Sequence, residues 1–161
     1  MFSFFTKKPP QNGELITSSL YDEITFYKQF ISDLQKCHSE VIIESPYITR
    51  RRMNILFPTF AKLIRKGIKI YIITRNPAEY TDAMGIQSEL AIQRFERTGI
   101  QVFLCDGNHH RKLAIIDRGI LWEGSLNILS QNNSREIMRR IISKKLSGDM
   151  FNFLNLAQIF Q

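Results

Sequence analysis

The sequence predicts a single α/β domain, with a mixed, mostly parallel central sheet that is flanked by helices and ends in an antiparallel hairpin. Apolar segments of strand length alternate with amphipathic segments of helix length through the first two thirds of the chain, which is typical of parallel β–α–β units. Two strands then follow with only a tight-turn signal between them. The 161 residues, 43% of them hydrophobic, suffice for one buried core.

The N-terminal part of the chain predicts a tail, a helix and a first strand. Residues 1–15 contain two prolines and a glycine and are predicted to form a flexible tail, so that the domain comprises residues 16–161. In residues 18–37, apolar side chains recur at helical spacing behind a serine that can cap a helix. Residues 40–48, EVIIESPYI, predict a strand that ends at Ser45-Pro46.

The middle of the chain predicts two further pairs of helix and strand. Residues 53–67 predict a helix that ends at a glycine, although Pro58 within it implies a kink or a later start. Residues 68–76 predict a strand that is apolar on both faces, as is usual at the centre of a sheet. Residues 82–99 predict a helix, and residues 100–106 predict a third strand.

The last third of the chain predicts antiparallel strands and a closing helix. Residues 111–117 and 120–125 are predicted to form a hairpin whose turn lies at Arg118-Gly119. Residues 135–141 predict another strand. Residues 147–161 predict a helix rich in Phe and Leu, for which packing against the core is favoured over a partner-binding face.

The composition gives weak information about partners and location. The formal net charge of +7 favours a polyanionic partner such as nucleic acid or an anionic lipid surface, although a solubilising surface explains it equally well. Cys37 and Cys105 are too few for a disulfide framework, and both are expected to be reduced and buried. No apolar run approaches the ~20 residues needed to span a bilayer, and the N-terminus lacks the pattern of a secretory signal, so we expect a cytoplasmic protein.

Polar side chains stand at the outer ends of the two hairpin strands. Because side chains alternate between the faces of a strand, His110 and Lys112 point the same way, as do Ser125 and Asn127. A turn at Arg118-Gly119 brings the start of the first strand beside the end of the second. The sequence therefore predicts that these four side chains meet at one edge of the sheet.

These residue types suit phosphoryl transfer without a metal. Lys and Asn can donate hydrogen bonds to phosphate oxygens, and His can act as nucleophile or general acid near neutral pH. A lone histidine at a strand end is more often structural. The group Cys105, His109 and His110 could also suggest zinc, but it lacks a second ligand pair at metal spacing. No metal or other cofactor is expected.

The pattern His110-x-Lys112-x4-Asp117, followed by Gly124-Ser125-x-Asn127, resembles the signature of the phospholipase D superfamily, the HKD motif. The resemblance covers roughly residues 20–142 and implies a phospholipase D-like fold. Within the superfamily the chain is most similar to the small nucleases with one motif per chain and to domains attached to helicases or other DNA-processing proteins. Asp117 belongs to the motif, but it lies past the polar cluster with opposite parity. We therefore interpret it as a structural residue at the end of the hairpin.

The resemblance also implies a role for each polar residue. His110 matches the nucleophile that forms a phosphohistidine intermediate, and Lys112 and Asn127 match the residues that hold the phosphate oxygens. Ser125 matches a small residue that supports the pocket. Glu136 stands where the superfamily often has a carboxylate that hydrogen-bonds the histidine.

The chain carries only one such motif, although the mechanism needs two histidines, one to attack phosphorus and one to protonate the leaving oxygen. No second His-x-Lys occurs in the sequence. We therefore expect a homodimer in which each subunit supplies half of a shared site. A partner chain or domain that supplies the second half, such as a helicase or another DNA-processing protein, is the alternative.

The leading interpretation is a metal-independent phosphodiesterase that cleaves nucleic acid, with DNA favoured over RNA. The run Arg50, Arg51 and Arg52 follows the first predicted strand of the sheet and could bind backbone phosphates, or it could simply be the solvated start of a helix. A phospholipid hydrolase or transferase of the same superfamily is one alternative. A nucleic-acid-binding module without turnover is another.

Overall fold

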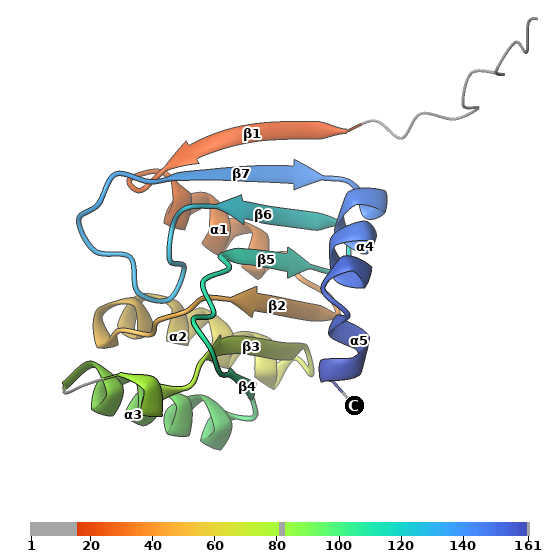
Figure 1. Cartoon of the computed structure of the whole chain (residues 1–161). Coiled ribbons are helices and arrows are strands. Elements are labelled where there is room, and N and C mark those ends of the chain that lie inside the picture. The colour runs from red at the N-terminus through yellow and green to blue at the C-terminus, as the bar shows by residue number, and fades with distance from the viewer. Residues whose placement is uncertain (1–15, 81–82, 161) are drawn as a thin grey trace, which may run out of the picture.

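The computed structural model describes residues 16–80 and 83–160, so the tail predicted for residues 1–15 lies outside the described residues. These residues form one sheet with helices on both faces (Figure 1). In chain order the elements are β1 (Thr17–Asp22), α1 (Phe26–Gln35), β2 (Glu40–Glu44), α2 (Arg50–Arg65), β3 (Lys69–Arg75), the 3-10 helix η1 (Pro77–Glu79), α3 (Ala83–Thr98), β4 (Gln101–Cys105), β5 (Leu113–Ile116), β6 (Ile120–Gly124), β7 (Ile137–Ile142), α4 (Lys144–Phe153) and α5 (Leu156–Ile159).

The seven strands lie in the order β1-β7-β6-β5-β2-β3-β4. The predicted mixed sheet flanked by helices is confirmed, and so is the antiparallel β5–β6 hairpin. The expectation that parallel pairs predominate is wrong, because only β2·β3 and β3·β4 are parallel while the other four pairings are antiparallel. After β4 the chain returns to the centre of the sheet, where β5 pairs with β2. The loop between β4 and β5 therefore crosses the end of the sheet at which β2 and β3 finish (Figure 1).

The first predicted helix is only partly correct, because Thr17–Asp22 forms a strand that pairs with β7. The helical stripe exists only from residue 26 onward. The carboxylate of Asp22 accepts hydrogen bonds from the backbone N–H groups of Ile24 and Thr25 and from the Thr25 hydroxyl, and this local turn ends the strand before α1 begins. The helix predicted for residues 53–67 starts earlier than expected, at Arg50, and contains Pro58 in its interior.

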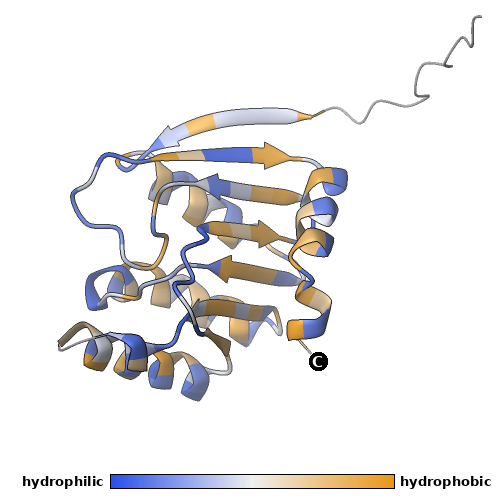
Figure 2. Cartoon of the chain, viewed as in Figure 1, coloured by the Kyte–Doolittle hydropathy of each residue, from blue (hydrophilic) through white to orange (hydrophobic). Residues whose placement is uncertain are grey.

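Two apolar layers lie on the two faces of the sheet, which Figure 2 shows as orange strands between partly orange helices. Helices α1, α2 and α3 cover one face, while α4 and α5 cover part of the other. Phe151 and Leu154 are buried there, which confirms the expected core packing, whereas Phe153 is 81% exposed. The single predicted C-terminal helix is divided at Asn155, whose φ is 52°. None of the described helices is both long and apolar enough to span a bilayer.

Asp117 anchors the far end of the hairpin, as predicted for a structural residue. Its carboxylate accepts hydrogen bonds from the backbone N–H groups of the α1–β2 loop, from the Ser39 hydroxyl at 2.7 Å and from the Cys37 thiol at 3.2 Å. The turn itself differs from the expected one, because positive φ falls on Asp117 and Arg118, not on Gly119. The hairpin that carries the motif is thus tied to the sheet at its closed end.

Candidate active site

His110 and Lys112 lie at the open end of the hairpin, just before β5. Lys112 Nζ is 2.8 Å from His110 Nδ1 and 3.5 Å from His110 Nε2, and it donates to the His110 carbonyl at 2.8 Å. The imidazole is exposed and the lysine is half-buried. Burial lowers the pKa of Lys112, and the negative charge of Glu136 opposes that effect. The pair thus places a cation directly beside a solvent-accessible imidazole.

The segment after β6 is fixed against the start of β7. Ser125 N–H donates to the Ile137 carbonyl at 3.0 Å, and Ile137 N–H donates to Ser125 Oγ at 3.1 Å. Gly124 permits this contact, because a Cβ at its position would lie 2.1 Å from the Ile137 carbonyl oxygen. A side chain there would force the two strands apart, so a glycine is needed immediately before the serine.

The structure divides the predicted four-residue cluster between two cavities. His110, Lys112 and Ser125 line a cavity of about 690 Å³. Asn127 instead lines a second cavity of about 810 Å³. Its side-chain oxygen Oδ1 is buried and has no hydrogen-bond partner among the described residues. A buried polar atom normally has a partner, so this amide is available to a ligand.

Tyr47 connects the second cavity to His110, a relation that the sequence analysis missed. It follows the Ser45-Pro46 end of β2, and its ring centroid lies 6.4 Å from that of His110 in an edge-to-face arrangement. On its other side it contacts Tyr80, with ring centroids 5.3 Å apart. An aromatic residue directly after a strand end was the available signal, but no pattern in the sequence links it to the distant motif.

A buried carboxylate lies behind the histidine pair. Glu44, at the end of β2, is fully buried, and its Oε2 lies 2.9 Å from Arg111 Nε and 4.0 Å from His109 Nε2. Burial raises the pKa of Glu44, and the Arg111 guanidinium opposes that rise. Burial also lowers the pKa of His109, and the positive charge of Arg111 adds to this effect. His109 is therefore a neutral interior residue, while His110 faces solvent.

Most of the chain matches a known protein family. The family model described as "Cardiolipin synthase, PLD-like domain" matches residues 30–155. The chain belongs to the phospholipase D superfamily. Among curated proteins there is no match. The match covers most of the chain and includes the hairpin that carries the motif.

Solved structures share this phospholipase D fold at low sequence identity. The chain is similar to a phospholipase D family member, Nuc from Salmonella typhimurium, with a TM-score of 0.72, 13% identity and coverage of 86% of this chain and 91% of that one. It is also similar to NucT from Helicobacter pylori, with a TM-score of 0.70, 19% identity and coverage of 91% and 96%. A phosphatidylserine synthase from Haemophilus influenzae matches with a TM-score of 0.64 and 17% identity, over 89% of this chain and 39% of that one.

The remaining predicted residues of this phospholipase D domain lie at different depths. Glu136 is half-buried, accepts a hydrogen bond from the Ser134 hydroxyl at 2.7 Å, and lies near enough to Lys112 to affect its pKa. Arg50 and Arg51 are exposed at the start of α2. Arg52 is 7% exposed and lies over the Tyr27 ring, 4.1 Å from its centroid. Only the first two arginines are accessible to a substrate.

The donor groups of the candidate site suit an anion. Within residues 16–80 and 83–160, no three His, Cys, Asp or Glu side chains are grouped to hold a metal ion. The cavity that contains His110 is instead lined by the Lys112 ammonium and the Ser125 hydroxyl, and the Asn127 amide lines the neighbouring cavity. Such groups bind phosphate oxygens and stabilise negative charge that develops on them.

Proposed function

We propose that the protein is a metal-independent phosphodiesterase that cleaves nucleic acid through a phosphohistidine intermediate, at a site shared by two copies of the chain. The observation that carries the proposal is the contact between Lys112 and His110. A lysine ammonium can only donate hydrogen bonds, so the nearer ring nitrogen of His110 accepts and carries a lone pair. An exposed imidazole nitrogen with an available lone pair, beside a cation, is suited to attack an anionic phosphodiester.

The first chemical step follows from this arrangement. A phosphate entering the site takes over the donors of Lys112 and releases the lone pair of His110. The imidazole nitrogen bonds to phosphorus, the bond from phosphorus to the leaving oxygen breaks, and that oxygen takes a proton from a general acid. Water then attacks the phosphohistidine and gives a proton to the group that served as the general acid, which releases the second product and restores both groups.

We infer that the general acid comes from a second copy of the chain. The sequence has three histidines. His109 is buried and neutral, and His38 lies beside Asp117, at the closed end of the hairpin. Neither of them reaches a phosphate at His110. His110 of a second copy, placed across a two-fold axis, supplies the acid and a second lysine together.

The cavity at His110 has an apolar rim against which a second copy of the chain could pack. Alongside the polar residues it is lined by exposed apolar side chains: Leu20 is 62% exposed, Ile137 is 61% exposed and Phe153 is 81% exposed. They come from β1, β7 and α4, on the sheet face that α4 and α5 leave partly open (Figure 1). Burying these groups favours association, and it would enclose the two histidines between the copies.

The choice of nucleic acid rests on charge. The net charge of +7 attracts a polyanion, and exposed Arg51 lines the cavity that contains Asn127, with exposed Arg50 next to it in the chain. These contacts are to the backbone and carry no base preference. DNA is the substrate that we would assay first.

Cleavage in excess EDTA tests the chemistry. We expect the native protein to cut single-stranded or double-stranded DNA with EDTA present, and His110→Asn to lose more than about a thousandfold in kcat/KM. His38→Asn is the matched control, because this histidine is exposed far from the site, and it should retain native activity. Loss of cleavage with EDTA would refute the metal-independent mechanism. Activity on a phospholipid vesicle but not on DNA or RNA would refute the substrate.

The mass in solution tests the shared site. We expect a dimer that persists under assay conditions, and Phe153→Asp should shift it towards monomer and lower activity together, because a charge would be placed in the apolar rim. Phe153 is not one of the proposed reacting groups. Because its side chain is 81% exposed, this variant should retain the fold of the native monomer, as measured by circular dichroism. A monomeric protein with full activity would overturn the two-copy site.

A further inference from the structure

The second cavity, beyond Tyr47, has features that the proposed chemistry does not use. Its volume is about 810 Å³, and its walls include the rings of Tyr47 and Tyr80 and the amide of Asn127. Both tyrosines are half-buried, so one part of each ring is supported by protein while another faces the cavity. Tyr47 also contacts His110, which places the cavity one residue away from the proposed nucleophile.

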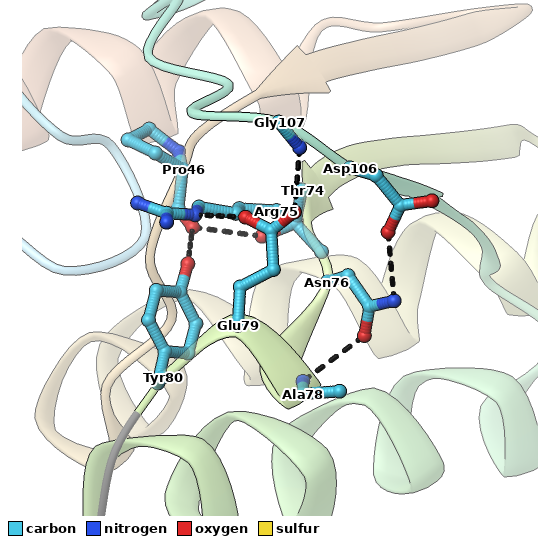
Figure 3. Close-up of polar contacts among 9 residues, drawn as sticks. All are labelled: Pro46, Thr74, Arg75, Asn76, Ala78, Glu79, Tyr80, Asp106 and Gly107. Carbon is cyan, nitrogen blue, oxygen red and sulfur yellow. Dashed lines mark hydrogen bonds and ion pairs between the residues drawn. The ribbon is translucent and has the colours of Figure 1, made fainter.

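Contacts among the loops that follow β2, β3 and β4 hold Tyr80 in place, as Figure 3 shows. Tyr80 Oη donates to the Pro46 carbonyl at 2.6 Å, which ties the segment after η1 to the β2–α2 loop. Thr74 Oγ1 donates to the same carbonyl at 3.3 Å. Burial raises the pKa of Tyr80 to about 12, and Tyr47 adds to the rise, so this hydroxyl stays protonated and remains a donor.

A second set of contacts closes the wall on the side of the β4–β5 loop, which leads to His110. Glu79 accepts from Arg75 Nε and from Gly107 N–H, each at 2.5 Å (Figure 3). Asn76 Nδ2 donates to Asp106 at 2.9 Å. These bonds join η1 to the segment that presents the nucleophile. The aromatic wall and the imidazole therefore belong to one connected frame and need little reorganisation on binding.

The lining chemistry matches a nucleobase better than another phosphate. The Arg75 guanidinium lies 5.2 Å from the Tyr80 ring centroid and is neutralised by Glu79. On the opposite rim, Arg51 is exposed and donates to Asn132 at 3.1 Å, where it can reach a backbone phosphate. Flat aromatic surfaces, a buried amide acceptor at Asn127 and a cation at the rim are what a base, its polar edge and its flanking phosphate require.

We propose that this cavity is a stacking site for one unpaired nucleobase next to the scissile phosphate, with Tyr47 as its main platform. The inference rests on the proposed function and deepens it, because it names a single-stranded segment as the substrate. In a duplex the faces of each base are covered by its neighbours, so a paired strand gains nothing from the platform. Tyr47 acts by positioning the strand, and the chemical step remains with His110.

The test compares two single strands of the same length and charge, dodecathymidylate and a dodecamer of abasic sugar phosphates. We expect the native protein to cleave the thymidine strand about 5- to 140-fold faster in kcat/KM, the range that corresponds to stacking of one base. Tyr47→Leu should reduce cleavage of the thymidine strand to the abasic level and leave the abasic strand unchanged. Tyr47→Phe, which keeps the ring, should behave as native.

Binding separates this inference from the proposed function. Fluorescence anisotropy with His110→Asn, alone and combined with Tyr47→Leu, measures the same strands without turnover. If the native protein cleaves neither strand but His110→Asn still prefers thymidine through Tyr47, the proposed function fails and the stacking site stands. If Tyr47→Leu weakens both strands equally, or neither, the stacking site is refuted. If the Tyr47→Leu variant keeps its affinity for the abasic strand, it is folded. We also expect its affinity for a duplex to be unchanged.

Discussion

The hydrogen bonds that converge on Asp117 predict a pH-dependent loss of stability when its charge is removed. Burial alone would raise the pKa of this carboxyl group, but the hydrogen bonds from the Ser39 side chain, the His38 backbone and the Cys37 thiol outweigh it and hold the pKa at about 2. The usual value is about 3.9. Each pKa unit corresponds to about 1.4 kcal/mol, so the charged form contributes at most about 2 kcal/mol, since the group keeps some contact with solvent.

The variant to make is Asp117→Asn. Asparagine tolerates a positive φ, here 50°, as well as aspartate does, so the backbone of the turn is not strained by the change. We expect the free energy of unfolding to fall by about 2 kcal/mol at neutral pH. Because the folded pKa is depressed, the advantage of aspartate is present above about pH 4 and disappears as the pH falls through about 2.

Urea unfolding followed by circular dichroism at several pH values measures this difference. Asp149→Asn is the control, because Asp149 is exposed on α4 in a surface pair with Lys145 and should change stability by no more than about 0.5 kcal/mol. A difference between native and Asp117→Asn that stays constant from neutral pH to about pH 3 would refute the electrostatic explanation. Equal stability at neutral pH would refute any structural role for the charge.

Three further changes test the frame around the site. Gly124→Ala should lower the melting temperature by about 6 to 12 °C, measured by calorimetry, because its Cβ would overlap a backbone carbonyl of β7. Asp33→Ala should cost about 3 kcal/mol in urea unfolding, because it leaves the Arg140 guanidinium without the buried carboxylate that it binds twice at 2.7 Å. Arg111→Leu should raise the pKa of Glu44 further, followed by carbon NMR of its carboxyl group, because burial would then act unopposed.

Each of these three predictions has an outcome that would contradict it. Gly148→Ala is the partner control for Gly124→Ala, since nothing lies within 4 Å of the added Cβ, and equal effects of the two would remove the steric argument. A double variant, Asp33→Ala with Arg140→Met, should recover stability, because no uncompensated charge stays behind. A pKa of Glu44 that stays constant or falls in Arg111→Leu would mean that the guanidinium does not act on the carboxylate.

The hairpin could be predicted from the sequence because it depends only on residues that are close together in the chain. Alternation along a strand and a short turn were enough to bring His110 and Lys112, just before the start of β5, beside Ser125, just after the end of β6. The structural role of Asp117 followed from its parity within the same segment. The β1 strand was missed because Thr17–Asp22 continues into a helix whose apolar stripe extends backward by chance, and pairing with β7 decides the conformation.

The rest of the candidate site depends on contacts between distant segments. Tyr47 and Tyr80 meet only because the loops after β2 and β3 lie side by side in a parallel sheet. Asn127 follows the predicted strand, but the chain has already turned there, with its carbonyl accepting from Gln131 N–H at 2.7 Å, and its side chain lines a different cavity. Arg52 shares a run with two exposed arginines, and the helical period directs it inward.

The alkylation rate of the buried thiol at the closed end of the hairpin reports how often the structure opens locally. Cys37 donates to Asp117, and burial, followed by that contact, raises the pKa of the thiol to about 12. Alkylating reagents react with the thiolate, so in the closed state at neutral pH this group is both shielded and protonated. Its labelling rate therefore measures how often the α1–β2 loop separates from the hairpin and exposes the thiol. Cys105, which is less buried at the end of the edge strand β4, gives a second labelling rate for comparison.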